Sequence, residues 1–130
     1  MLDYAKEDVA ARVRALTGKA GVDVVIDHVG AATMWASLRS LAKGGRVVSC
    51  GATSGFAVEV PMNLVYFKSL SILGSTMGSL GELHELLGHV AAGRLAPVVD
   101  SVLPLSQVAE AHRRLEARDV FGKILLDPSL

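Results

Sequence analysis

The chain has 130 residues, a length that suits one compact domain, and it is 51% hydrophobic but only 5% aromatic. Thirteen basic residues balance thirteen acidic ones, so the formal net charge is zero, and nothing favours a nucleic-acid partner. No apolar run approaches the roughly 18 residues that a membrane-spanning helix needs, so no membrane partner is expected.

The N-terminal segment, MLDYAKED, is charged and lacks the apolar centre of a signal peptide. Cys50 is the single cysteine, which excludes a disulfide within the chain. Both features favour a cytoplasmic protein. A single cysteine also falls short of the three or four ligands that zinc needs, so we expect Cys50 to be a small buried hydrophobic residue.

Apolar spacing and turn residues predict alternating helices and strands along the whole chain. In chain order they are helix 7–16, strand 22–29, helix 31–42, strand 46–50, edge strand 56–60, helix 61–67, strand 70–73, helix 80–92, strand 98–103, helix 106–117 and strand 123–126. Ser106 is predicted to cap the last helix. The alternation predicts an α/β fold with a parallel sheet and helices on both faces.

Strand 46–50 is followed by Gly51, Ala52 and Thr53, small residues that let a ligand approach the backbone. An ordinary strand-to-loop turn is the alternative interpretation. Right-handed crossovers make strands 22–27, 46–50 and 70–73 neighbours, so three small-residue loops share one edge of the sheet. Ligands bind at this carboxyl edge in open α/β sheets, which predicts a site there.

Two polar residues end the first of these strands. Asp27 either orients a neighbouring backbone group or simply ends the strand. His28 either makes a hydrogen bond within its loop or contacts a cofactor or substrate.

The ordered set of motifs resembles the medium-chain dehydrogenase/reductase superfamily, in its zinc-containing alcohol dehydrogenase and quinone oxidoreductase branches. The segments that carry the resemblance are GVDVVIDHVG (21–30), SLAKGGRVVSCGATSG (40–55), SILGSTMGS (71–79), PVVDSVLPL (97–105) and AEAHRRLEARDVFGKILL (109–126). They cover nearly the whole chain.

The resemblance implies binding of the nicotinamide half of NAD or NADP, with NADP slightly favoured, at the strand-end loops. The residues implied are Val29, Gly30, Gly51, Ala52, Thr53, Ser75, Thr76 and Met77. It implies hydride transfer, chemistry that belongs to the cofactor. It identifies no catalytic residue and no zinc ligand in this chain.

Two features of the family pattern are missing from this sequence. No G-x-G-x-x-G segment follows a strand, and the separate catalytic domain is absent. We therefore expect residues 1–130 to form a single domain: the C-terminal half of a Rossmann-like fold plus closing segments, inactive alone. The alternative function is a homodimeric interaction module, assembled through exposed sheet edges and without catalysis.

Overall fold

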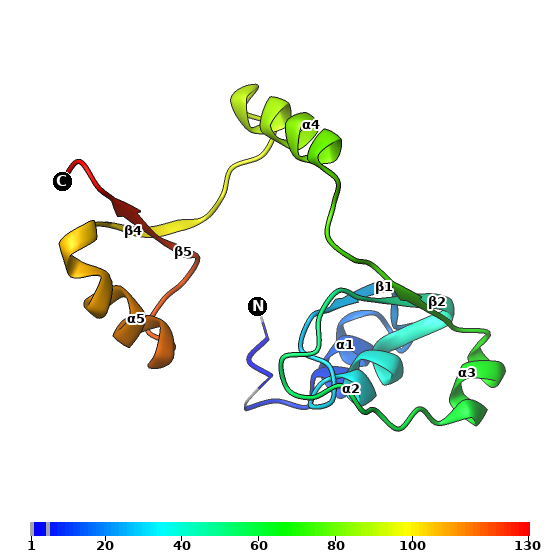
Figure 1. Ribbon diagram of the computed structural model, residues 1–130. Helices are drawn as coiled ribbons and strands as arrows, with labels where there is room; N and C mark the ends of the chain where they lie inside the picture. Colours follow the sequence, from blue (N-terminus) through cyan, green and yellow to red (C-terminus); the bar gives the residue numbers. More distant parts are fainter. Residues whose placement is uncertain (1, 5) are drawn as a thin grey trace. The chain divides into compact units, whose positions relative to one another are not determined.

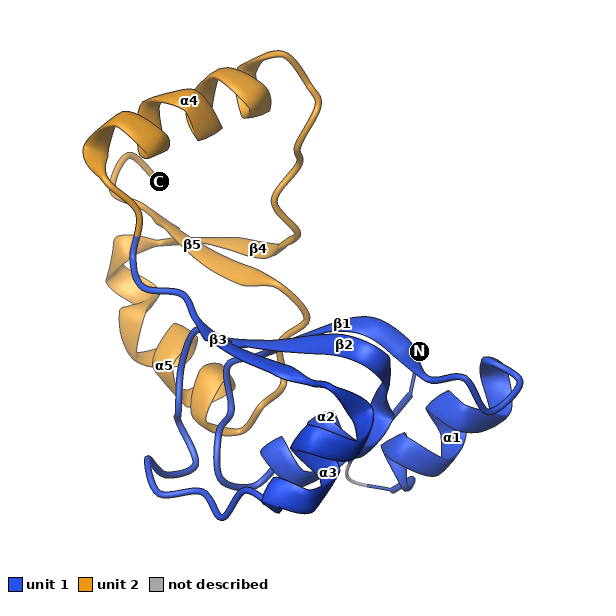
Figure 2. Ribbon diagram, turned by 90° about the vertical axis from the view of Figure 1, so that its right-hand side faces the viewer, with its two compact units in different colours: residues 1–77 blue, residues 78–130 orange. Residues whose placement is uncertain are grey.

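A computed structural model describes residues 2–4 and 6–130. The chain divides into two compact units, unit 1 (Met1–Met77) and unit 2 (Gly78–Leu130), coloured separately in Figure 2. Each unit is an α/β structure with a parallel sheet, as the alternation of helices and strands predicts. The organisation as a single domain stays a prediction.

Unit 1 contains a three-stranded parallel sheet in the order β1-β2-β3 (Figure 2). The strands are β1 (Val22–Asp27), β2 (Leu41–Ser49) and β3 (Ser71–Gly74). This order confirms the predicted neighbours. β2 begins five residues earlier than predicted, because Leu41 already pairs with Val22, and a register shift then absorbs residues 42–45 before Arg46 pairs with Val24.

Three helices accompany this sheet: α1 (Val9–Leu16), α2 (Met34–Ser40) and α3 (Met62–Lys68). The Asp8 side chain caps α1 by accepting a hydrogen bond from the Ala11 amide at 3.0 Å. Lys68, at the end of α3, donates to the Leu41 carbonyl at 2.6 Å and thereby ties α3 to the end of α2.

The core of unit 1 lies on the side of the sheet that α2 and α3 cover (Figure 2). Leu38, Leu41 and Val47 are fully buried, and Met34 and Leu70 complete the cluster. On the opposite face, Val24 and Ile26 are 49% and 72% exposed.

Residues 56–60 form no strand, so the predicted edge strand is wrong. Val58 and Val60 both pack against the core cluster from a loop, which accounts for the apolar residues at alternate positions there. Phe56 at the start of this loop is 95% exposed. The alternating pattern therefore reflects one-sided packing without strand pairing.

Unit 2 contains α4 (Leu80–Ala91), β4 (Val99–Pro104), the 3₁₀ turn η1 (Leu105–Gln107), α5 (Val108–Glu116) and β5 (Lys123–Asp127) (Figure 1). β4 and β5 pair in parallel. The predicted Ser106 cap is wrong: Ser106 lies within η1, and this turn leads directly into α5 without a side-chain cap. Within the described residues, no helix is long and apolar enough to cross a membrane.

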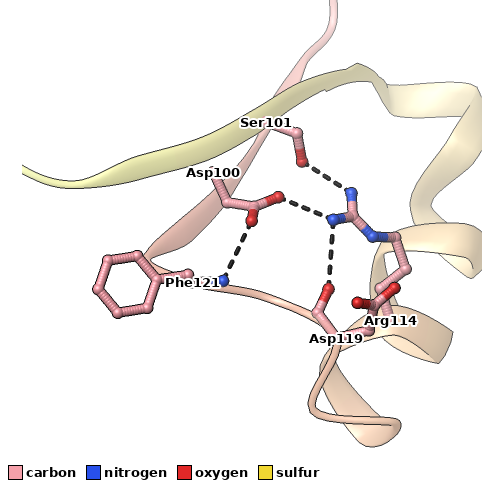
Figure 3. A network of polar contacts seen from close by, with 5 residues as sticks. All are labelled: Asp100, Ser101, Arg114, Asp119 and Phe121. Carbon is pink, nitrogen blue, oxygen red and sulfur yellow. Dashed lines mark hydrogen bonds and ion pairs between the residues drawn. The ribbon is translucent and has the colours of Figure 1, made fainter. Parts of the chain in front are cut away.

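A polar network ties α5 and the loop after it to β4 (Figure 3). Arg114 donates to the Asp100 carboxylate at 2.8 Å, to the Ser101 hydroxyl at 3.0 Å and to the Asp119 carbonyl at 3.2 Å. The Phe121 amide donates to the other Asp100 oxygen at 3.1 Å. This amide, then Ser101 and Arg114, hold the pKa of Asp100 below its ordinary value.

Candidate functional site

Three loops follow β1, β2 and β3 at the carboxyl edge of the sheet in unit 1. The Cys50 amide donates to the Asp27 carbonyl at 3.0 Å, and the Ser75 amide donates to the Ser49 carbonyl at 2.9 Å. These bonds extend the strand pairing by one residue beyond β2 and beyond β3. The predicted meeting of three strand-end loops is therefore what the structure shows.

Ser54 joins the loop after β2 to the loop after β1. Its amide and its hydroxyl both donate to the Val29 carbonyl, at 2.8 and 2.6 Å. The same hydroxyl accepts a hydrogen bond from the Ala32 amide at 2.9 Å, and the Ala31 amide donates to the Gly55 carbonyl at 3.3 Å. The two loops thus form one hydrogen-bonded unit.

Gly30 and Gly51 allow these two loops to approach backbone to backbone. A Cβ atom on Gly30 would lie 2.8 Å from the Gly55 carbonyl oxygen and 2.9 Å from the Ala52 Cα, and Gly30 has φ +88°. A Cβ atom on Gly51 would lie 2.8 Å from the His28 carbonyl oxygen. Both positions require glycine because the chain packs against itself there.

Asp27 is buried at the end of β1, where its carboxylate accepts hydrogen bonds from four groups. Oδ1 accepts from the amides of Val29 and Gly30, both at 2.9 Å. Oδ2 accepts from the Ser37 hydroxyl at 2.6 Å and the Thr33 hydroxyl at 2.8 Å. Of the two interpretations of Asp27, the structure supports the one in which it orients neighbouring backbone groups.

The pKa of Asp27 reflects two opposed effects. Burial raises it, and the hydrogen bonds from Ser37, Gly30, Thr33 and Val29 lower it; the net result is a pKa below the ordinary value of 3.8. Asp27 is therefore an ionised carboxylate at neutral pH.

The eight predicted cofactor-binding residues divide into two groups. Val29, Gly30, Gly51 and Ala52 lie in the two joined loops, together with the exposed Thr53. Ser75 is held beside Ser49, and the next two residues, Thr76 and Met77, are exposed. All eight belong to unit 1, and their contact with a cofactor stays a prediction.

Sequence reasoning missed two features of this edge. No sequence pattern predicts the role of Ser54, because a single serine in a loop of small residues has no distinctive spacing from other residues. The roles of Thr33 and Ser37 could have been predicted. The two residues are four positions apart, on one face of a predicted helix that follows an aspartate. Cys50 is exposed, so its expected burial is wrong; it follows the last residue of β2, where the chain leaves the sheet.

Residues 1–126 match the family model described as "Zinc-binding dehydrogenase". The chain belongs to this family. Bovine (Bos taurus) "Quinone oxidoreductase-like protein 2" is 33% identical over 134 residues, covering 96% of this chain and 38% of the relative. "2-haloacrylate reductase" from Burkholderia sp. is 35% identical, covering 98% of this chain and 41% of the relative.

Solved structures of alcohol dehydrogenases share the fold. An NAD-dependent alcohol dehydrogenase is 46% identical with a TM-score of 0.82, covering 95% of this chain and 36% of that one. The alcohol dehydrogenase of Aeropyrum pernix is 31% identical with a TM-score of 0.84, covering 98% and 36%. The chain spans about two fifths of the length of the two curated relatives named above. Its fold is the Rossmann-like fold of medium-chain dehydrogenases.

The family's description mentions zinc, a metal that proteins hold with three or four side-chain ligands. Across residues 2–4 and 6–130, no three His, Cys, Asp or Glu side chains are grouped so that they could hold a metal ion. The described residues therefore do not fit a zinc site, and we derive no step that uses zinc.

Proposed function

We propose that this chain supplies the nicotinamide-facing part of a cofactor-binding domain in an NAD(P)-dependent oxidoreductase of the quinone oxidoreductase or alcohol dehydrogenase type. The observation that carries the proposal is the presence of three strand-end loops at one sheet edge, two of them joined by hydrogen bonds, where ligands bind in open α/β folds. Val29, Gly30 and Gly51–Thr53 would line the ribose and nicotinamide, and Ser75–Met77 would contact the carboxamide through their backbone.

The edge offers polar groups suited to such a ligand. Among the described residues, the backbone amides of Gly51, Ala52 and Thr53 have no hydrogen-bond acceptor, so they are available to a ligand. A bound nicotinamide cofactor would supply the hydride chemistry, while these residues would hold and orient it. We expect the 130-residue chain alone to have little or no dehydrogenase activity.

Calorimetric titration of the chain with NADPH and NADH tests the proposal and the slight preference for NADP. Thr53→Trp places a bulky side chain at the exposed part of the edge, and we expect it to abolish binding. Lys43→Trp is the matched control, because Lys43 is also exposed but lies in the register shift near the start of β2, whereas the three loops follow the strand ends. Equal binding by both variants, or turnover of NAD(P)H with quinones or aldehydes by the chain alone, would contradict this proposal.

A second proposal concerns self-association of the chain, for which we also propose a cytoplasmic location. β1 and β3 are the outer strands of the sheet in unit 1, and outer strands with apolar side chains recruit partners. We propose a homodimer that forms through these edges. Light scattering should give twice the chain's mass of 13.6 kDa; a monodisperse monomer at all concentrations would argue against the dimer.

A further inference from the structure

The Asp27 carboxylate has no capacity left for a ligand. An ionised carboxylate offers about four lone-pair positions. Two amides, from Val29 and Gly30, and two hydroxyls, from Thr33 and Ser37, already occupy them. Any effect of Asp27 on a bound molecule must therefore act through the loop that it holds.

Asp27 is one reason why the loop after β1 offers a ligand no backbone donor. It takes the amides of Val29 and Gly30, while Gly55 and Ser54 accept from the amides of Ala31 and Ala32. The loop after β1 therefore has no backbone donor left between residues 29 and 32. The free amides of Gly51–Thr53 lie in the other loop.

The position of Gly30 couples Asp27 to those free amides. Gly30 lies so close to Ala52 and Gly55 that no Cβ atom would fit between them. A shift of Gly30 would therefore displace the loop that contains residues 51–53. Because Asp27 fixes the Gly30 amide at 2.9 Å, it indirectly fixes the second loop as well.

We propose that Asp27 is the positioning residue of this cofactor edge. It holds the loop after β1 in the one arrangement that supports the loop after β2, and so presents the amides of Gly51–Thr53 to acceptor atoms of the ligand. This inference rests on the proposed function for the identity of the ligand. The positioning of the loops by Asp27 is tested separately from ligand binding.

Two substitutions separate the acceptor role of Asp27 from its charge. Asp27→Ala removes both acceptors and leaves the Val29 and Gly30 amides without a partner. Asp27→Asn keeps one acceptor oxygen for these amides, and its NH₂ group can donate to the hydroxyls of Thr33 and Ser37, which accept as well as donate. The positioning role predicts that asparagine rescues binding and alanine does not.

Ser40→Ala is the matched control. Ser40 is also buried, and its hydroxyl donates within α2 to the Ala36 carbonyl at 2.7 Å, away from the loops. This variant removes a buried polar group of the same unit without touching the edge. Its binding should match that of the unchanged chain.

The experiment is calorimetric titration of the full chain and its variants with nicotinamide mononucleotide, together with amide hydrogen exchange by NMR. We expect Asp27→Ala to weaken binding at least about tenfold, a loss of ~1.4 kcal/mol. Asp27→Asn and Ser40→Ala should stay within about threefold of the unchanged chain. Exchange of the Val29 and Gly30 amides should accelerate in Asp27→Ala alone, ahead of global unfolding.

The outcomes distinguish the two proposals. Unchanged binding and unchanged exchange in Asp27→Ala would overturn the positioning role. Failure of the unchanged chain to bind would refute the proposed function, and loop exchange would then decide the role of Asp27. If Asp27→Ala does not fold, the double variant T33V/S37A replaces it: both carboxylate anchors on Oδ2 are lost, and unchanged Gly30 exchange would overturn the inference.

Discussion

Unit 1 has a cluster of five buried apolar residues beside its sheet, whereas Ala111 is the single buried hydrophobic residue among those described in unit 2. In α4, none of the twelve residues is buried. Apolar burial is the dominant stabilising term in folding. Unit 1 therefore has a larger source of stability of its own, and unit 2 depends more on strand pairing and polar contacts.

Each unit also uses one carboxylate to order a loop, in different surroundings. Asp27 is 4% exposed, and all its partners are uncharged. Asp100 pairs with the Arg114 guanidinium, and the two side chains are 19% and 25% exposed. A buried carboxylate served by neutral donors is insensitive to salt, while a partly exposed ion pair is weakened by screening.

The largest expected difference between the units is in core packing. Leu38→Ala removes a fully buried side chain, so it should lower the free energy of unfolding by about 2–5 kcal/mol. Leu86→Ala on α4 is the matched control, because Leu86 is 47% exposed; it should change the free energy by less than about 1 kcal/mol. Urea denaturation measures both, and equal losses would remove the distinction.

Backbone crowding at the site edge should produce the next largest effect. Gly30→Ala adds both the strain of positive φ and a collision with the loop after β2, which together should cost about 2–4 kcal/mol. Gly44→Ala has φ +77° but open space around it, so it should cost only ~1–2 kcal/mol. Thermal denaturation compares them; a costlier Gly44 variant would show that the loops do not crowd Gly30.

Acid should loosen the loop after α5 in unit 2. The pKa of Asp100 is lowered in the folded chain, so its contribution is present above the ordinary value of 3.8 and is lost as pH falls through the lower folded value. The Phe121 amide signal in NMR should follow this titration. Arg114→Gln should move the midpoint upward toward 3.8, and an unchanged midpoint would exclude Arg114 from the network.

The smallest effect is expected at Phe56. Its side chain is 95% exposed in a loop without strand pairing, so Phe56→Ser should change the free energy of unfolding by no more than about 0.5 kcal/mol. This variant tests whether the exposed parts of unit 1 resemble the exposed surface of unit 2. A loss above ~1 kcal/mol in urea denaturation would indicate that the Phe56 side chain is buried against other residues.

Much of the fold could be predicted from the sequence because local patterns and topology agree. The apolar run of β1, the run that ends β2 and the crossover rule were enough to order three parallel strands. The failures lie where the local sequence pattern did not determine the structure. Val58 and Val60 alternate like a strand yet pack from a loop, and a 3₁₀ turn takes the place of a Ser106 cap.

The site could be predicted only in part. Small residues after three neighbouring strands located the edge, since glycine has a conformational meaning that is visible in sequence. The reason predicted for the glycines was close approach of a ligand, whereas in the structure Gly30 and Gly51 accommodate the chain's own backbone. The hydrogen bonds of Asp27 and Ser54 span up to 25 residues, and no local pattern reveals such pairings.

The exposure of Cys50 has a practical consequence. It is the chain's single thiol, it is one residue from Gly51, and its sulfur lies 3.9 Å from the Asp27 carbonyl oxygen. A maleimide dye would therefore attach at one defined place, next to the three loops, without any engineered cysteine. The natural sequence already provides a fluorescent reporter position, and protection of this thiol against alkylation would reveal occupancy of the edge in unpurified samples.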